Sequence, residues 1–386
     1  MIKRDVALTK ALFFLFGFGI MGWVPRFPEL KANLGVNNGL FGSMLSMGAF
    51  GSLVALLTIG HLVDHFGGKR MLIVGQTILS FAYIAIVNVT DIQAFLIINI
   101  LVGFSISMLH IANNAQAFYD QDRGGKNLVV SAAGYWSAGS LISTLLSMYL
   151  IGKVELSLHI TVLQVVVYFL TLIVILSRRE TLIPSNRHDR VSKSILKDLR
   201  RFNFDWMVNF GLIFGIMLEF AIGDWSTIFA KEEGGISATW APLPFLCFTL
   251  FMIIGRVSIT SLRKRYKIYN LVRFGGILAG TSFILGIWLV HIFGLLGLLI
   301  SFSLAGLGSS FIGPSFLNIA NTRIDLPSSI VIGQISAVNV MLSWILKQVI
   351  AFVAQFAGLQ VALTIPALLA IAVGLFTGVF KQAPAK

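Results

Sequence analysis

GHLVDHFGGKR, at residues 60–70, is a short polar stretch in a strongly apolar part of the chain, with one acid, two histidines, two bases and two adjacent glycines. The blocks on either side of it, Leu40–Ile59 and Met71–Val89, carry no charged residue. A helix of about 20 apolar residues is long enough to cross a bilayer. The stretch is therefore predicted to be a tight polar turn between two membrane-spanning helices.

The rest of the chain repeats this alternation. Of the 386 residues, 56% are hydrophobic and 12% are charged, whereas a soluble domain has about 25% charged residues. Long apolar blocks predict transmembrane helices, and twelve are expected, at 8–28, 38–60, 70–88, 92–118, 127–151, 159–177, 205–229, 239–262, 270–291, 294–319, 329–353 and 360–380. The predicted fold class is an all-α polytopic membrane protein. The single cysteine, Cys247, lies inside a span, so neither a disulfide nor a CxxC metal site is expected.

The positive charge is distributed unevenly across the predicted membrane. The net charge is +13, and 23 of the 29 lysines and arginines lie on the side that both termini share. This is the positive-inside distribution, which places both termini in the cytoplasm of a multi-pass plasma (inner) membrane protein. The basic excess is therefore an orientation signal, and no nucleic-acid partner is expected.

A basic segment divides the spans into two sets of six. The expected domains are an N-terminal six-helix bundle at 1–177, a cytoplasmic linker at 178–204 and a C-terminal six-helix bundle at 205–386. Residues 200 positions apart match, as in Gly35 and Gly235. Parallel duplication of six helices is a known plan of transporters, with the solute site near the middle of the membrane between the halves.

The composition of the opening stretch also predicts its geometry. Gly60 is expected to allow close approach of another helix, and Gly67 and Gly68 are expected to permit a positive φ in the turn. Asp64 is expected to pair with the two bases that follow it or to cap a neighbouring helix.

The pattern GxLxDxxGGKR resembles the signature loop between helices 2 and 3 of the major facilitator superfamily, through Gly60, Leu62, Asp64, Gly67, Lys69 and Arg70. GWVPRFPELKANLG at 22–35 and EFAIGDWSTIF at 219–229 resemble a sugar- and fucose-permease-like branch. The resemblance implies a monomer of two pseudo-symmetric six-helix bundles, alternating access by rocking of the bundles, and a cavity lined by helices 1, 4, 7 and 10. It also implies that the loop latches the two halves in the outward-open state.

Polar residues inside a span are costly and usually face a cavity or another helix. In the span at 92–118, Ser107, His110 and Asn114 share a stripe with Gly103, and Asn113 flanks it. The stripe fits a cavity wall that binds a polar solute, and equally a set of interhelical hydrogen bonds. Further candidates for the substrate cavity are Trp23, Arg26, Tyr135, Trp136, Trp225, Ser310, Asn318, Asn321 and Asn339.

Two of these features have specific interpretations. Arg26 is expected to extend its side chain to the membrane interface, with a contact to Asp224 or to an anionic solute as alternatives. The span at 294–319 is expected to be kinked and flexible because it contains Gly306, Gly308, Gly313 and Pro314.

Charged residues at membrane depth need partners. Lys347 and Asp224 are predicted to lie at similar heights, since a helix rises about 1.5 Å per residue, and either Asp224 or Glu219 is expected to pair with Lys347, as a structural pair or a gate. Glu219 is the candidate for a proton-binding carboxylate. A salt bridge between Glu219 and Arg256 is the alternative.

The predicted function is secondary active transport of a small polar organic solute, such as a sugar or a related metabolite, driven by protons. The alternative is an exporter of drugs or hydrophobic metabolites, which two departures disfavour: Asn99 replaces the arginine of the family's helix 4, and AGYWSAGSLIS at 133–143 lacks the Gly-Pro motif of drug antiporters. The sequence contains no GxxxxGK[ST], HExxH or GxSxG motif, so neither direct use of ATP nor an enzyme is expected. The expected partners are the solute, protons and the lipid bilayer, without a cofactor.

Overall fold

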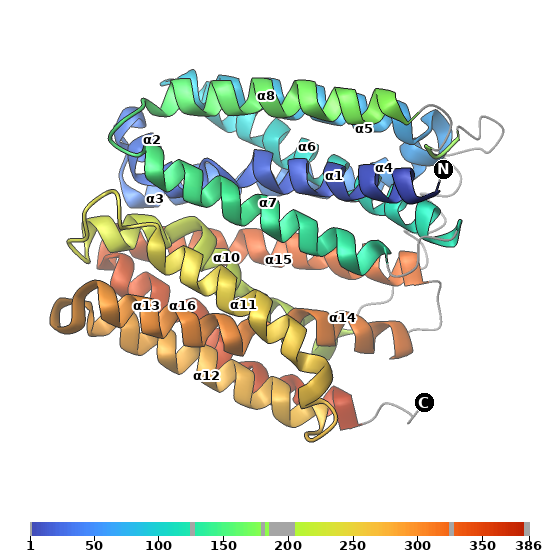
Figure 1. The fold of residues 1–386 in the computed structure, drawn as a ribbon. Helices are drawn as coiled ribbons and strands as arrows, with labels where there is room; N and C mark the ends of the chain where they lie inside the picture. Colours follow the sequence, from blue (N-terminus) through green and yellow to red (C-terminus); the bar gives the residue numbers. More distant parts are fainter. Residues whose placement is uncertain (1, 124–127, 179–181, 185–204, 324–327, 382–386) are drawn as a thin grey trace. The chain divides into compact units, whose positions relative to one another are not determined.

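The computed structural model describes residues 2–123, 128–178, 182–184, 205–323 and 328–381, and within these ranges it is built of helices without strands (Figure 1). Ten segments of this part of the chain are long and apolar enough to cross a membrane. The helices α7 (Leu128–Leu150) and α11 (Leu243–Leu262) complete the twelve spans that the sequence predicts. The protein is therefore an all-α, twelve-span membrane protein.

The chain forms two compact units. Unit 1 consists of Met1–Leu34 and Met47–Arg201. Besides α7, its described elements are α1 (Ile2–Met21), the 3-10 helix η1 (Val24–Arg26), α2 (Phe27–Leu34), α4 (Gly48–Phe66), α5 (Gly68–Asn88), α6 (Ile92–Asp122) and α8 (Leu156–Ser177). Most of the predicted linker, 178–204, lies outside the described residues.

Unit 2 consists of Gly35–Ser46 and Phe202–Lys386. Besides α11, its elements are α3 (Asn38–Ser46), α10 (Trp206–Glu232), α12 (Ile268–Trp288), α13 (Val290–Ser309), α14 (Ile312–Arg323), α15 (Ser328–Ala357), α16 (Leu359–Ala372) and the 3-10 helix η2 (Val373–Lys381). The sequence does not predict that α3, the first part of the second span, groups with this unit. The Gln348 Nε2 atom donates to Ser46 Oγ over 2.6 Å, and Gly42 packs directly on the Trp225 ring.

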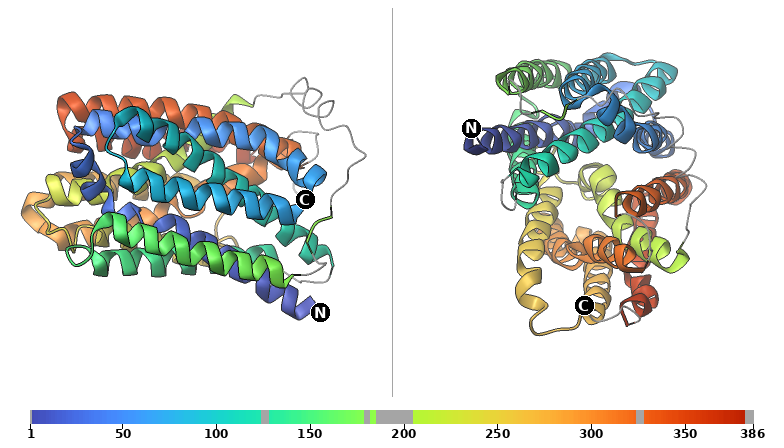
Figure 2. Two further views of the ribbon diagram at one scale, coloured as in Figure 1. Left: turned by 90° about the horizontal axis from the view of Figure 1, so that it is seen from above. Right: turned by 90° about the vertical axis from the view of Figure 1, so that its right-hand side faces the viewer.

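The two units share one pattern of helix packing. In unit 1, α1 contacts α7 and α8, α4 contacts α6, and α5 contacts α6 and α8. In unit 2, α10 contacts α15 and α16, α11 contacts α13, and α12 contacts α13 and α16. The long helices of each unit run alongside one another (Figure 2). The same partners recur in order, which is the packing expected of duplicated six-helix halves.

Glycines bring particular helices into close contact. A Cβ atom added to Gly139 of α7 would lie 2.1 Å from the Phe14 carbonyl oxygen of α1. In unit 2, a Cβ atom on Gly306 of α13 would lie 2.2 Å from the Phe248 carbonyl oxygen of α11. Dispersion forces between closely approaching backbones hold helices together where the hydrophobic effect between them is weak.

The turn between α4 and α5 is a single residue. Gly67 has φ 82° and ψ 155°, and its N–H donates to Val63 O over 2.8 Å. Only Gly67 carries the positive φ predicted for both glycines, because Gly68 is already the first residue of α5. The prediction for Gly60 is wrong, since a Cβ atom there would have no heavy atom within 4 Å outside its own surroundings.

The predicted repeat and the predicted kink both have structural counterparts. Gly35 and Gly235 have the same φ, 64°. Gly35 directly follows α2, and Gly235 lies three positions after the end of α10. The tenth span is broken between α13 and α14, after Ser309 and before Ile312. The break is close to Gly313 and Pro314, which cannot support a regular helix as well as other residues.

Candidate functional site

The helix α10 carries two acids inside the helix, Glu219 and Asp224, and each has a basic partner. Asp205 caps the helix by accepting from Val208 N over 3.2 Å. Glu219 lies thirteen residues from each end of α10, and its Oε1 atom is 3.6 Å from Arg256 Nη2 of α11. Arg256 also donates through Nε to Ser310 O over 3.1 Å. The guanidinium group therefore keeps one hydrogen bond that does not depend on Glu219.

The second pair is shorter. Lys347 Nζ of α15 lies 2.7 Å from Asp224 Oδ2 of α10. The ammonium group is also 5.3 Å from the centre of the Phe220 ring, within the range of a cation–π contact. Asp224 is one of the two partners that the sequence predicts for Lys347. Glu219 pairs with Arg256 instead, because five residues along a helix turn the two acids about 140° apart.

Both pairs are partly exposed. The side chains of Arg256 and Glu219 are 40% and 33% exposed, and those of Lys347 and Asp224 are 21% and 22% exposed. Charged groups at the depth of a bilayer are very costly in hydrocarbon and usually face a water-filled space or the protein interior. The faces of α10, α11 and α15 that carry these groups are therefore suited to a polar pathway.

In unit 1, the polar stripe of α6 is divided by its packing. Gly103 contacts the backbone of Gly48 in α4. Further along, Ser107 and Asn114 are partly exposed and His110 is exposed, and Asn114 Nδ2 donates to His110 O of its own helix over 2.8 Å. Asn113 is buried, and its Oδ1 atom has no hydrogen-bond partner in the described part of the chain. Three members of the stripe thus remain available to a polar ligand.

Of the four aromatic candidates for the substrate cavity, three are packed inside the units and one is exposed. Trp23 is buried in unit 1 in edge contact with Phe27 and Tyr83, and Trp225 is buried in unit 2 against Gly42. Trp136 packs beside a small core cluster formed by Phe13, Ala117 and Ala132. Tyr135 is exposed and lines a groove along α1. Packing accounts for the first three.

The prediction that Arg26 extends to the interface is wrong. Its side chain is 1% exposed, and Nη2 donates to Glu29 Oε2 and to Val154 O, each over 2.6 Å. Sequence reasoning did not pair Arg26 with Glu29, although a spacing of three residues along one helical turn is a usable signal for such a contact.

Three polar candidates of unit 2 differ in exposure. Ser310 is fully buried against Gly255, and Asn339 is buried and donates to Asn209 Oδ1 of α10 over 3.2 Å. Asn318 is exposed. The side chain of Asn321 lies outside the described residues. Of the three that are described, only Asn318 presents a side chain that a solute can reach.

The signature loop exposes its charges. Asp64, Lys69 and Arg70 are all exposed, and within the described ranges none of them forms an ion pair. Asp64 therefore neither pairs with the following bases nor caps a helix, contrary to the expectation. Gly68 N instead donates to Ile183 O over 3.0 Å, so the turn is held by its backbone.

Sequence reasoning missed a buried ionic cluster in unit 1. Arg178, just after α8, makes two hydrogen bonds of 2.8 and 2.7 Å to the Asp120 carboxylate of α6, and it also donates to Thr9 of α1. Gln116 donates to Asp120 over 2.9 Å and accepts from Ile183 N over 3.0 Å. The cluster ties three helices together at one end of the unit.

The part of the chain that the structure describes contains no group of three or more His, Cys, Asp or Glu side chains arranged to hold a metal ion. The charge pairs of α10 each combine one acid with one base.

Comparison with known proteins gives consistent matches over nearly the whole chain. The model of the Major Facilitator Superfamily matches residues 11–345. An uncharacterized MFS-type transporter of Yersinia pestis is 23% identical over 378 residues, which are 96% of this chain and 94% of the relative. Among solved structures, a nucleoside transporter has a TM-score of 0.75 at 14% identity, over 98% of this chain and 99% of the other. A D-xylose–proton symporter has a TM-score of 0.74 at 13% identity, over 97% of each chain. At these identities the two solved structures show a shared fold.

Proposed function

Because the chain belongs to the Major Facilitator Superfamily, we propose that this membrane transporter carries a small polar organic solute by alternating access, driven by the proton gradient. The solved structures with a similar fold include a nucleoside transporter and a D-xylose–proton symporter. A sugar or a related metabolite is the proposed class of solute. The single observation that carries the proposal is the partly exposed Glu219–Arg256 pair in the middle of α10.

Glu219 is the proposed proton-binding group. Its contact with Arg256 is 3.6 Å, longer than the 2.7 Å between Lys347 and Asp224. When Glu219 is protonated, Arg256 still has the hydrogen bond to Ser310 O. Protonated Glu219 is neutral, and the released Arg256 cation keeps that hydrogen bond and has a side chain that is 40% exposed, which makes the pair suited to repeated opening. One proton crossing the membrane provides about 2.3 kcal/mol per 100 mV, enough to drive accumulation.

The proposed solute contacts are polar side chains that remain reachable, namely Ser107, His110 and Asn114 of α6 and Asn318 of α14. Hydroxyl, imidazole and amide groups donate and accept hydrogen bonds, as a polyhydroxylated solute requires. An exporter of hydrophobic compounds would favour apolar and aromatic groups in these places.

The proposed orientation has both termini in the cytoplasm of the plasma membrane, and the functional form is a monomer. The uneven distribution of lysine and arginine supports the orientation. The orientation is tested by replacing Lys264 or Lys153 with cysteine, since these residues lie on predicted opposite sides of the membrane. A membrane-impermeant thiol reagent added outside the cell should label the cysteine at position 153 and not the one at position 264.

The test of the function begins with a search for the solute. Purified protein is screened by thermal shift against sugars, sugar acids, nucleosides, amino acids and drugs, since a ligand that binds the folded form raises the apparent stability. The best ligand is then followed in proteoliposomes in two assays, accumulation driven by an imposed pH gradient and counterflow exchange without one.

Glu219→Gln is expected to abolish accumulation and to retain counterflow, because solute exchange does not require release of the proton. Glu232→Gln, an exposed acid at the end of the same helix, is the control and should behave as the wild type. Accumulation that is unaffected by both Glu219→Gln and an uncoupler would remove the proton claim. Selective binding of hydrophobic drugs in the screen would favour the exporter.

A further inference from the structure

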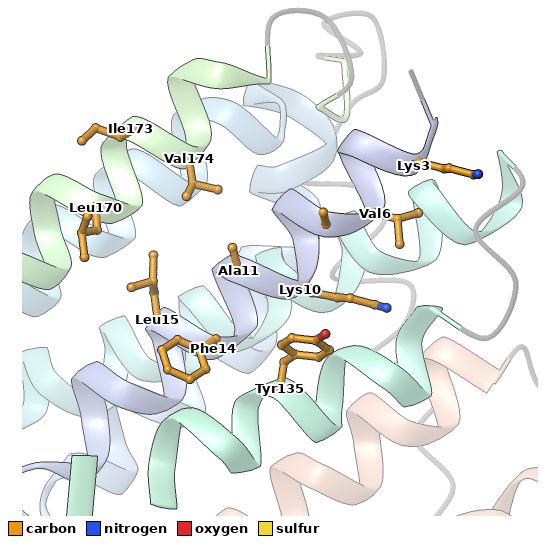
Figure 3. Close-up of a pocket in the computed structure, with 11 residues that line it drawn as sticks. Lys3, Val6, Lys10, Ala11, Phe14, Leu15, Tyr135, Leu170, Ile173 and Val174 are labelled. Atoms are coloured by element: carbon orange, nitrogen blue, oxygen red, sulfur yellow. The ribbon is translucent and has the colours of Figure 1, made fainter. Parts of the chain in front are cut away.

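A groove of about 610 Å³ runs along unit 1 between α1, α7 and α8 (Figure 3). Its lining is apolar apart from Lys3 and Lys10 of α1 and the hydroxyl end of Tyr135 of α7. None of these residues belongs to the charge pairs of α10. A cavity of this size is in the range of small-molecule and cofactor sites.

The two lysines form a positive end that has no acidic partner among the described residues. They are seven residues apart, two turns of a helix, so both project from the groove side of α1. Neither forms an ion pair with any described residue, and Asp5, the nearest acid along α1, does not line the groove. Lys10 Nζ lies 5.3 Å from the centre of the Tyr135 ring, and Figure 3 shows its side chain extended toward that ring.

The other end of the groove is hydrocarbon in character. Leu15 of α1 faces Leu170 of α8 across it, and Phe14 and Ile173 belong to the same apolar lining. Leu170 and Ile173 are 44% and 59% exposed. Large apolar side chains exposed on a membrane-spanning helix are in contact with lipid, because water contact at that depth is unavailable to them.

The length of the groove fits one leaflet of a bilayer. Lys3 and Leu15 are twelve positions apart, which corresponds to about 18 Å of helix. Half the hydrocarbon core of a bilayer is about 15 Å. A lipid whose headgroup lies at the lysines would therefore place the first part of its acyl chain along the apolar section between Lys10 and Leu15, about 7.5 Å of helix.

We propose that this groove is a binding site for an anionic phospholipid. The phosphodiester is bound by the ammonium groups of Lys3 and Lys10, with the Tyr135 hydroxyl beside them, and one acyl chain lies between α1 and α8. Lysine and tyrosine at this position match the charge and the amphipathic character of the headgroup region. The inner leaflet is the one occupied if the termini are cytoplasmic as proposed above, but binding itself does not depend on that orientation.

The test is native mass spectrometry of the full-length protein in a neutral detergent, titrated with phosphatidylglycerol or phosphatidylcholine of the same acyl chains. Phosphatidylglycerol should bind selectively, and Lys3→Gln with Lys10→Gln should weaken its binding about 10- to 30-fold. The matched control is Lys264→Gln with Lys267→Gln, which removes two exposed charges elsewhere. Inorganic phosphate should not displace the lipid, since it lacks the acyl chains.

A second pair of variants keeps the charge and fills the groove. Ala7→Phe should weaken phosphatidylglycerol binding, whereas Val165→Phe, on an exposed part of α8 outside the groove, should not. Equal binding of the two lipids, equal losses in the two lysine double variants, or displacement of lipid by a second copy of the chain would each overturn the proposal. Circular dichroism and gel filtration establish that each variant is folded, and the binding readout is independent of transport.

Discussion

Lys347 and Asp224 form a 2.7 Å ion pair that joins α15 to α10 inside the second unit. Each side chain is only about one fifth exposed, and the ammonium group also lies over the Phe220 ring. A charge in such surroundings is stabilised chiefly by its partner. The pair therefore has two testable consequences, one for stability and one for transport.

Neutralising either residue alone should be more harmful than neutralising both. Lys347→Gln leaves Asp224 without its counter-charge, and Asp224→Asn does the same to Lys347. A double-mutant cycle on thermal unfolding in detergent should give a coupling energy of about 1–2 kcal/mol. The charge swap Lys347→Asp with Asp224→Lys should recover part of the transport lost in the single variants. Additive effects in the cycle would show that the pair contributes nothing as a pair.

Asp120→Asn should destabilise the first unit strongly. Arg178 and Asp120 have side chains 0% and 4% exposed, and removing one partner of a buried ion pair costs about 3–5 kcal/mol. The loss should appear as a marked fall in the unfolding midpoint. Arg70→Gln, which removes an exposed base of the same unit, should change stability by less than about 0.5 kcal/mol. Similar midpoints for the two variants would contradict the buried cluster.

Two glycines of α7 should respond in opposite ways to alanine. Gly139→Ala forces a methyl group to within 2.1 Å of the Phe14 carbonyl oxygen unless α1 moves away, and overpacking of this kind costs about 1–3 kcal/mol or more. A Cβ atom on Gly134 meets nothing within 4 Å. Gly134→Ala should therefore be neutral or stabilising by up to about 1 kcal/mol. The measurement is the unfolding midpoint of each variant, and a reversed order would exclude the close α1–α7 contact.

Gly67→Ala should destabilise the turn between α4 and α5. Its φ of 82° with ψ 155° is a conformation open to glycine and strained for alanine, at a cost of about 1–3 kcal/mol. Gly60→Ala, at a helical position with free space around the added atom, should leave stability unchanged or slightly raised. The comparison also tests whether Gly60 lies in open space, since a close helix contact there would make its variant the more harmful of the two.

Several features of the site followed from local sequence. The spans were recognisable because each is a continuous apolar block, and the Lys347–Asp224 pair because two rare charges lay at similar depth. The prediction that the Arg26 side chain extends to the membrane interface is wrong, because a position at the end of a span suggests an exposed side chain. Arg26 is instead the buried last residue of η1, and Glu29 of α2 and Val154 O accept its hydrogen bonds.

The buried cluster around Arg178 had no local signal. Arg178 and Asp120 are separated by 58 residues and belong to different spans, so no helical periodicity relates them. The assignment of α3 to unit 2 was equally hidden, because Ser46 and Gln348 are 302 residues apart. Hydropathy places both segments in the membrane without indicating their neighbours.

The membrane-spanning segments and their duplication were predictable from the amino-acid sequence, because the cost of placing a residue in hydrocarbon depends mainly on that residue and its helix. The buried Arg178–Asp120 pair, the glycines at helix contacts and the polar groups that stay exposed became known from the packing of the helices. These contacts join helices that are up to hundreds of residues apart in the sequence. A helix satisfies its own backbone hydrogen bonds whatever its neighbours are, so its sequence does not indicate which helices it contacts.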